Sequence, residues 1–107
     1  MNKILIINKK NKNEGNYIKF YIGRPSPLGN PYMIESWMGE GCGRIAAIRE
    51  YRTYLREQII EGSQEVCAEL LRMHNALKEG DIALECWCAP MMCHGEVIKE
   101  YLETGKL

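Results

Sequence analysis

The chain has 107 residues, of which 46% are hydrophobic and 26% are charged, and its fourteen basic residues balance fourteen acidic ones. This length and composition exclude a disordered or low-complexity protein and predict that residues 1–107 form a single domain. The balanced charge gives no strong sign of a nucleic-acid partner, although six cations crowd the first quarter of the chain: Lys3, Lys9, Lys10, Lys12, Lys19 and Arg24.

The N-terminal quarter predicts two strands. Ile4–Ile7 and Tyr17–Ile22 are rich in β-branched and aromatic residues, and the polar stretch between them, which includes Gly15, predicts a hairpin-like loop. The apolar run at Ile4–Ile7 is too short for a signal peptide core or a membrane span, so we expect a cytoplasmic protein with no membrane partner. Five cysteines without a secretion signal are expected to stay reduced.

Two helices are predicted after a long loop. The loop spans Gly23–Gly43 and contains three prolines and five glycines, and loops of this length are usually functional or disordered. Five residues then recur at spacings of three and four and predict a helix over residues 44–61: Ile45, Ile48, Tyr51, Leu55 and Ile59. Gly62 is expected to stop this helix, and Ser63 to be the N-cap of a second helix that ends at Gly80.

A strand and a helix complete the predicted fold. "DIALECW", residues 81–87, predicts a short buried strand, and the spacing of Val97, Ile98, Tyr101 and Leu102 predicts a helix over residues 95–104. The expected fold is Rossmann-like α/β, with a three- to four-stranded mixed sheet covered by about three helices. Ligands in open α/β sheets collect where strands end and helices begin.

The stretch "CWCAPMMCHGE", residues 86–96, permits a metal site. A zinc set of Cys86, Cys88, Cys93 and His94 has suitable ligand types, but the chain has no second cysteine pair at the usual spacing. We therefore expect no cofactor and keep a zinc-binding structural or interaction module as an alternative. Cys86 and Trp87 are expected to pack in the core.

The same stretch also permits covalent chemistry. Cys93 lies at the start of the final helix, where the helix dipole favours a thiolate, and His94 follows it. Cys93 and His94 are thus the catalytic candidates of a cysteine-dependent enzyme acting on a nucleotide. Adjacent residues do not face one another on a helix, which argues against a nucleophile–base pair here. The sequence leaves open whether a reaction is catalysed.

The interpretation that we favour is an anion-binding loop. No Ser, Thr, Asp or Asn caps the final helix, so its first N–H groups can face a ligand, and Gly95 permits close approach. His94 can donate one more hydrogen bond or supply charge. The alternative is that Cys93 or His94 caps the helix and that nothing binds.

A second loop also carries groups that are suited to binding an anion. "GRPSPLGNPY", residues 23–32, combines prolines that stiffen the backbone with the forked cation of Arg24. Its alternative role is purely structural, with Arg24 paired to a carboxylate. Both loops follow strands and are expected to meet at one edge of the sheet. The predicted ligand-binding residues are Gly23, Arg24, Pro25, Ser26, Gly29, Asn30, Cys88, Cys93, His94 and Gly95.

Three segments, "YIGRPSPLGNPY", "IREYRTYLRE" and "LECWCAPMMCHGEVI", together resemble a small bacterial and phage family classed as a domain of unknown function. The resemblance covers residues 17–102 and brings no established activity. It implies that the family's motif positions are Gly23, Arg24, Pro25, Gly29, Asn30, Pro31, Cys86, Trp87, Cys88, Pro90, Cys93, His94 and Gly95. Together, the residues predict a cytoplasmic protein, in the host cytoplasm if phage-encoded, that binds an anionic small molecule, with a nucleotide or nucleotide derivative as the leading class.

Overall fold

The computed structural model describes residues 2–10, 15, 17–24, 26–29, 40–87 and 94–107 of the chain, with the side chains of residues 40–44 excepted. Its elements, in chain order, are β1 (Ile4–Asn8), β2 (Ile18–Tyr21), α1 (Glu40–Ile60), α2 (Gln64–Glu79), β3 (Ile82–Cys86) and α3 (Gly95–Thr104). The order and type of all six elements agree with those predicted from the sequence. The fold is therefore α/β.

The sheet differs from the predicted one in two ways. Its order is β1-β3-β2, and both outer strands run parallel to β3. The predicted mixed sheet is therefore wrong for the three strands that the structure describes. The predicted hairpin between β1 and β2 is also wrong, because β3 lies between these strands and they point the same way.

The apolar character of β3 explains its central place. Ile82, Ala83 and Leu84 are fully buried, and β3 has a neighbouring strand on each side. On the face that points away from the helices, β2 carries Lys19, whereas β1 carries the half-buried Leu5 and Ile7. A strand buried on both faces takes the middle of a parallel sheet, and a half-buried strand takes an edge.

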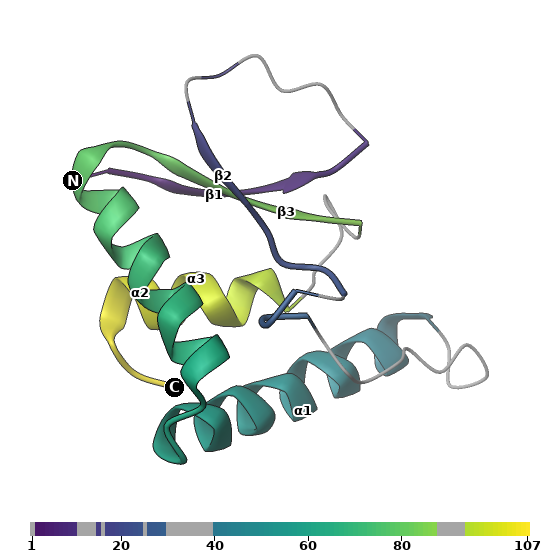
Figure 1. Cartoon of the computed structure of the whole chain (residues 1–107). Helices are drawn as coiled ribbons and strands as arrows, with labels where there is room; N and C mark the ends of the chain where they lie inside the picture. The colour runs from purple at the N-terminus through teal and green to yellow at the C-terminus, as the bar shows by residue number, and fades with distance from the viewer. Residues whose placement is uncertain (1, 11–14, 16, 25, 30–39, 88–93) are drawn as a thin grey trace.

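The core lies between the sheet and the three helices, which gather on one side of it (Figure 1). Side chains in register on neighbouring strands point to the same face, so Ile4, Ile82 and Leu84 face the helices. The helices contribute the following buried residues to this core: Tyr51, Leu55, Val66, Leu70, Met73, Val97 and Ile98. Four of these residues, Tyr51, Leu55, Val97 and Ile98, belong to the apolar spacings that predicted the first and last helices.

Glycines with positive φ follow two of the helices. Gly62 has φ 75° after α1, and Gly105 has φ 74° as the C-cap of α3, a conformation that glycine adopts without steric cost. The predicted stop at Gly62 is confirmed. Ser63 occupies the N-cap position of α2, but its side chain makes no capping hydrogen bond. No helix within the described ranges is both long and apolar enough to cross a membrane.

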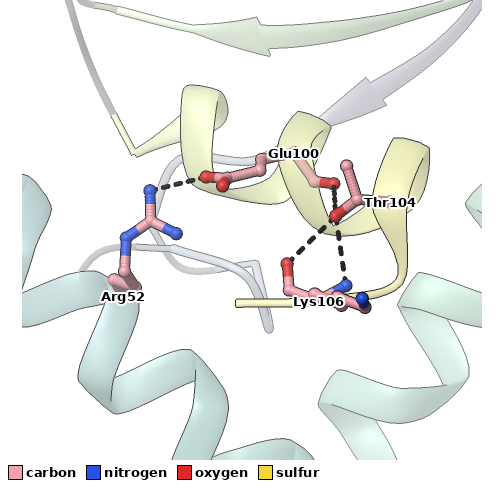
Figure 2. Close-up of polar contacts among 4 residues, drawn as sticks. All are labelled: Arg52, Glu100, Thr104 and Lys106. Carbon is pink, nitrogen blue, oxygen red and sulfur yellow. Dashed lines mark hydrogen bonds and ion pairs between the residues drawn. The ribbon is translucent and has the colours of Figure 1, made fainter.

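A polar link on the protein surface joins α1 to α3. The Arg52 guanidinium donates to the Glu100 carboxylate across 2.6 Å, as Figure 2 shows. The Thr104 hydroxyl donates to the Glu100 backbone carbonyl at 2.8 Å and accepts from the Lys106 N–H at 3.1 Å. Arg52 and Glu100 are partly exposed, so this ion pair contributes at most about 1 kcal/mol to stability. It lies apart from the strand ends discussed below.

Candidate functional site

The three parallel strands end at one edge of the sheet. Backbone hydrogen bonds continue the sheet pairing past the strands, because the Lys9 N–H donates to the Cys86 carbonyl at 2.8 Å and the Ile22 N–H donates to the Glu85 carbonyl at 2.9 Å. The segment after β2 therefore begins beside the end of β3. This is the edge at which parallel α/β sheets usually bind ligands.

The segment that follows β2 forms two successive turns. We call the described residues 22–24 and 26–29 the GRP loop. The Ser26 N–H donates to the Gly23 carbonyl at 2.8 Å, and the Gly29 N–H donates to the Ser26 carbonyl at 2.9 Å. A Cβ atom at Gly29 would lie 3.0 Å from both N and Cα of Arg24, so a side chain there would force the backbone apart. Gly29 thus holds the loop closed against Arg24.

Two ring side chains bind the GRP loop from the core side. The Tyr51 hydroxyl, on α1, donates to the Leu28 carbonyl at 2.7 Å, and Nε2 of His94 lies 2.6 Å from the Ile22 carbonyl. The two rings meet edge to face with centroids 4.9 Å apart. Both side chains are buried. We call Tyr51 and His94 the buried clamp, because they fix the loop to α1 and to the start of α3.

The surroundings of the His94 ring determine its tautomer and its protonation. A carbonyl oxygen only accepts, so Nε2 carries the proton, and Nδ1 is the unprotonated nitrogen of the neutral ring. Burial lowers the pKa of His94 below its usual value of 6.5, the hydrogen bond to Ile22 opposes this shift, and the positive charge of Arg24 lowers the pKa further. His94 is therefore neutral at pH 7, and its Nε2 proton is already used within the protein.

Two other ring side chains bind the GRP loop from the outer side. Nε1 of Trp87 donates to the Tyr21 hydroxyl at 2.9 Å, and that hydroxyl donates to the Arg24 carbonyl at 2.9 Å. The Lys9 ammonium lies 4.4 Å from the centroid of the Tyr21 ring, and the Lys10 ammonium lies 6.0 Å from that of Trp87. We call Tyr21 and Trp87 the outer pair. The prediction that Trp87 packs in the core is wrong, because it is 52% exposed.

The end of β1 supports the outer pair. The Asn8 side-chain amide donates to the Trp87 carbonyl at 3.2 Å, and its oxygen accepts from the Lys10 N–H at 2.8 Å. Asn8 thus ties the turn after β1 to the residue after β3. Two of the six N-terminal cations, Lys9 and Lys10, come to lie beside the outer pair for this reason.

Two side-chain groups of the GRP loop have no partner among the described residues. Arg24 is exposed, and within the described residues no carboxylate forms an ion pair with it. The predicted structural alternative, Arg24 paired to a carboxylate, thus finds no support in this part of the chain. The Ser26 hydroxyl is buried and has no hydrogen-bond partner among the same residues. An orphaned buried hydroxyl is uncommon and needs an explanation.

The start of α3 lies beside the GRP loop. His94 occupies the N-cap position, its carbonyl accepts from the Val97 N–H at 3.0 Å, and its side chain makes no capping hydrogen bond. The alternative in which the His94 side chain caps the helix is therefore wrong. Glu96 is an exposed acidic residue in the first turn, so it opposes an anion at this helix end.

The structure brings together six of the ten predicted ligand-binding residues, and we list them here: Gly23, Arg24, Ser26, Gly29, His94 and Gly95. The other four lie outside the described residues: Pro25, Asn30, Cys88 and Cys93. Those four positions, and the catalytic candidacy of Cys93, stay predictions.

The same limit applies to the zinc hypothesis. Of its four proposed ligands the structure describes Cys86, which is buried in the core, and His94, whose Nε2 is hydrogen-bonded to the Ile22 carbonyl. No group of three or more potential metal ligands occurs within the described ranges. The complete set also needs Cys88 and Cys93, so zinc binding stays a prediction.

The sequence did not reveal the two tyrosines of this site. Tyr51 belongs to the apolar spacing that predicts α1, and Tyr21 lies in the second predicted strand. One signal was present, because a buried tyrosine hydroxyl needs a hydrogen-bond partner. The identity of that partner, a loop carbonyl 23 residues away in the case of Tyr51, depends on tertiary packing.

A separate hollow lies between the helices. It has a volume of about 460 Å³, and its lining is mostly apolar: Ile59, Cys67, Leu70, Leu71, His74, Tyr101, Leu102 and Gly105. Nothing in the described part of the chain indicates what would cover it. The strand ends therefore remain the better candidate, since they combine cations, aromatic rings and an orphaned hydroxyl.

Comparison with known families yields one match. The family model described as "Domain of unknown function (DUF4326)" matches residues 6–104, nearly the whole chain. No curated protein and no solved structure matches the chain. The resemblance inferred from the sequence motifs is therefore confirmed at the level of the family.

Proposed function

Because the chain belongs to this family of unknown function, DUF4326, its role has to be argued from its own residues, and we propose that it binds a phosphorylated or otherwise anionic small molecule. A nucleotide or nucleotide derivative is the leading class. The ligand would lie between the GRP loop and the start of α3. In this respect the domain would work as Rossmann-like folds do, with its ligand at the carboxyl ends of parallel strands.

The observation that carries the proposal is the hydrogen bond from His94 to the Ile22 carbonyl. This 2.6 Å bond holds the first residue of the GRP loop against the N-terminus of α3. It also brings Arg24 close enough for its charge to act on the His94 ring. A cation with no described carboxylate partner and a helix N-terminus thus face the same region, and both favour an anion.

The orphaned hydroxyl of Ser26 is a second supporting observation. It is buried in the loop that carries Arg24, and it has no partner in the described structure. Burial of a hydroxyl without a hydrogen bond is unfavourable by about 1–3 kcal/mol, and a ligand oxygen would remove this penalty. The Ser26 hydroxyl is suited to a phosphate or sugar oxygen because it can donate or accept.

We assign the contacts as follows. Arg24 binds the negative charge with its forked guanidinium, and backbone N–H groups at the start of α3 bind phosphate oxygens. Asn30 would bind a sugar or base, and Cys93 would lie at the helix start; these two contacts are predictions from the sequence alone. His94 orients the helix start, since its Nε2 proton is used within the protein.

The test is calorimetric titration of the intact chain with inorganic phosphate and with the four ribonucleoside 5′-monophosphates. Arg24→Ala is expected to weaken nucleotide binding about 10- to 100-fold, because a hydrogen bond to a charged group contributes roughly 1.5–3 kcal/mol. Arg24→Lys keeps the charge without the fork and is expected to lose less. Arg56→Ala is the matched control, because this exposed arginine of α1 lies in another part of the fold, beside Ile60 and Lys106.

Two results would count against anion binding. One is the absence of any heat of binding with phosphate and every nucleotide. The other is equal loss in Arg24→Ala and Arg56→Ala, which would mean that general charge and not the GRP loop attracts the ligand.

The competing hypotheses have their own readouts. Metal analysis that finds about one equivalent of zinc, together with unfolding by a chelator, would favour the zinc module. Conversion of a bound nucleotide that Cys93→Ser abolishes, while binding is kept, would favour the cysteine-dependent enzyme. We place the working protein in the cytoplasm, the host cytoplasm if it is phage-encoded, because reduced thiols are stable there.

A further inference from the structure

Trp87 is an exposed aromatic residue that is held in a fixed position. Half of its surface faces solvent, yet its indole N–H is bound to the Tyr21 hydroxyl at 2.9 Å and its carbonyl accepts from Asn8 at 3.2 Å. A large ring of this kind usually packs in the core when only stability matters. An exposed ring that is fixed by hydrogen bonds is a typical element of a binding surface.

The ring lies next to the proposed anion site. The Tyr21 hydroxyl binds both Nε1 of Trp87 and the Arg24 carbonyl, so the indole is within two hydrogen-bond lengths of the Arg24 backbone. By strand register, Tyr21 and Glu85 share the sheet face that points away from the helices, and Trp87 follows two residues later on the same face. The indole and the guanidinium thus come from neighbouring segments of one edge.

The charges around Trp87 also favour a nucleotide. The Lys10 ammonium lies 6.0 Å from the centroid of the indole, and the Lys9 ammonium lies 4.4 Å from that of Tyr21. Glu85 is the acidic neighbour on this face, and the two lysines outnumber it. The long side chain of Lys10 can rotate away when a flat ring takes its place, while its charge stays near a phosphate.

We propose that Trp87 is a stacking platform for the base of a nucleotide whose phosphate lies at Arg24. This inference rests on the proposed function and narrows its ligand to molecules that carry a flat aromatic ring. Stacking tolerates every base, because each has a π-face, so Trp87 supplies affinity for a base without selecting among bases. Tyr21 is a positioning residue that fixes the indole relative to the GRP loop.

The test compares AMP with ribose 5-phosphate, which lacks the base, by calorimetric titration of the intact chain. Trp87→Ala is expected to weaken AMP binding about 5- to 150-fold and to leave the affinity for ribose 5-phosphate unchanged. Trp87→Phe keeps an aromatic face but loses the N–H that binds Tyr21, so it is expected to weaken AMP binding less than Trp87→Ala does. Leu71→Ala is the control, because this equally exposed apolar residue lines the distant hollow.

Fluorescence gives a second measurement that leaves Trp87 in place. The chain has two tryptophans, so Trp37→Phe makes Trp87 the sole indole. AMP is expected to quench its emission, whereas ribose 5-phosphate at the same occupancy is expected to leave it nearly unchanged.

Each outcome separates the two proposals. If inorganic phosphate, ribose 5-phosphate and all four nucleoside monophosphates fail to bind, the proposed function is overturned, and the stacking inference with it. AMP binding that Trp87→Ala does not weaken would overturn only the stacking inference. Equal weakening of AMP and ribose 5-phosphate would overturn it too, since Trp87 would then only support the loop.

Discussion

Ring side chains bind carbonyl groups of the GRP loop on two sides, but the rings are buried on one side and partly exposed on the other. On the core side, the rings of Tyr51 and His94 bind two loop carbonyls and are buried. On the outer side, Tyr21 binds the Arg24 carbonyl, and it is bound in turn by the half-exposed Trp87. The buried clamp has no room for a ligand at its Tyr51 and Nε2 contacts, whereas the outer pair presents a ring face to solvent.

This difference in burial predicts a difference in role. Loss of a buried partner leaves a carbonyl without water or a donor, at a cost of about 1–3 kcal/mol. Loss of an exposed partner costs less, because water replaces it. The buried clamp should therefore determine stability, and the outer pair should determine binding. The predictions below test that division, beginning with the largest expected effect.

Removal of the Tyr51 side chain should have the largest effect on stability. Tyr51→Ala is expected to lower the free energy of unfolding by about 3–5 kcal/mol, because it leaves a cavity and also removes the donor to Leu28. Urea denaturation followed by circular dichroism measures this change. Tyr51→Phe, which keeps the ring, should lose only about 1–3 kcal/mol. Equal losses in the two variants would show that the hydroxyl, and not the ring, carries the stabilisation.

Replacement of His94 by phenylalanine should have the next largest effect. His94→Phe keeps a ring against Tyr51 but removes the N–H that pairs with the Ile22 carbonyl, so we expect a loss of about 1–3 kcal/mol in unfolding free energy. His74→Phe, at an exposed position of α2, is the matched control and should change stability by less than about 0.5 kcal/mol. If His94→Phe has the same unfolding free energy as the wild type, the buried clamp does not stabilise the fold.

The stability of the wild-type chain should depend on pH through His94. The pKa of folded His94 is lowered from 6.5, chiefly by burial, so below pH 6.5 the unfolded chain binds more protons than the folded one. His94 therefore destabilises the fold progressively as the pH falls from 6.5 towards its folded pKa, and has no such effect above 6.5. Unfolding free energies of wild type and His94→Phe should thus converge at acid pH. Parallel pH profiles would contradict the prediction.

Loss of the Tyr21 hydroxyl should lower stability less than replacement of His94 by phenylalanine. Tyr21→Phe removes the hydrogen bonds to Trp87 and Arg24, but both are accessible to water, so we expect a loss below about 1 kcal/mol. The same variant should weaken AMP binding more than ribose 5-phosphate binding, because the indole loses its fixed position. A stability loss as large as that of His94→Phe would mean that the two sides of the loop do not differ.

The smallest effect on stability is expected at Ser26. Its buried hydroxyl has no partner among the described residues, so Ser26→Ala should leave the unfolding free energy unchanged or raise it. Nucleotide affinity should fall, because the hydroxyl would then be missing from the loop. Thermal denaturation with and without AMP measures both quantities, since a ligand raises the melting temperature according to its affinity. A clear loss of stability without ligand would show that Ser26 has a structural partner.

Local patterns in the sequence were sufficient for the elements of the fold. The apolar spacing located α1 and α2 within a few residues, and it located α3 at the bounds found in the structure, Gly95–Thr104. Gly62 ended α1 as predicted, because a left-handed turn there requires glycine. These features depend on neighbours three or four residues apart, so they can be predicted from the sequence alone.

The failed predictions depended on distant partners. The hairpin between β1 and β2 was wrong because β3, more than sixty residues after β2 begins, pairs with both strands. Trp87 was expected in the core, but the pleat of β3 turns Trp87 and Cys86 to opposite faces. Only the pairing of the strands decides which of these faces the helices cover.

By itself, the sequence determined the element order, the family, and the two loops whose residues make up the candidate site. The tertiary structure alone decided which side chains join those loops: Tyr51 and His94 in the core, Tyr21 and Trp87 outside it. The physical reason is that periodicity reports contacts along one element, whereas a ring that donates to a loop carbonyl must find it across the packed interface of sheet and helices.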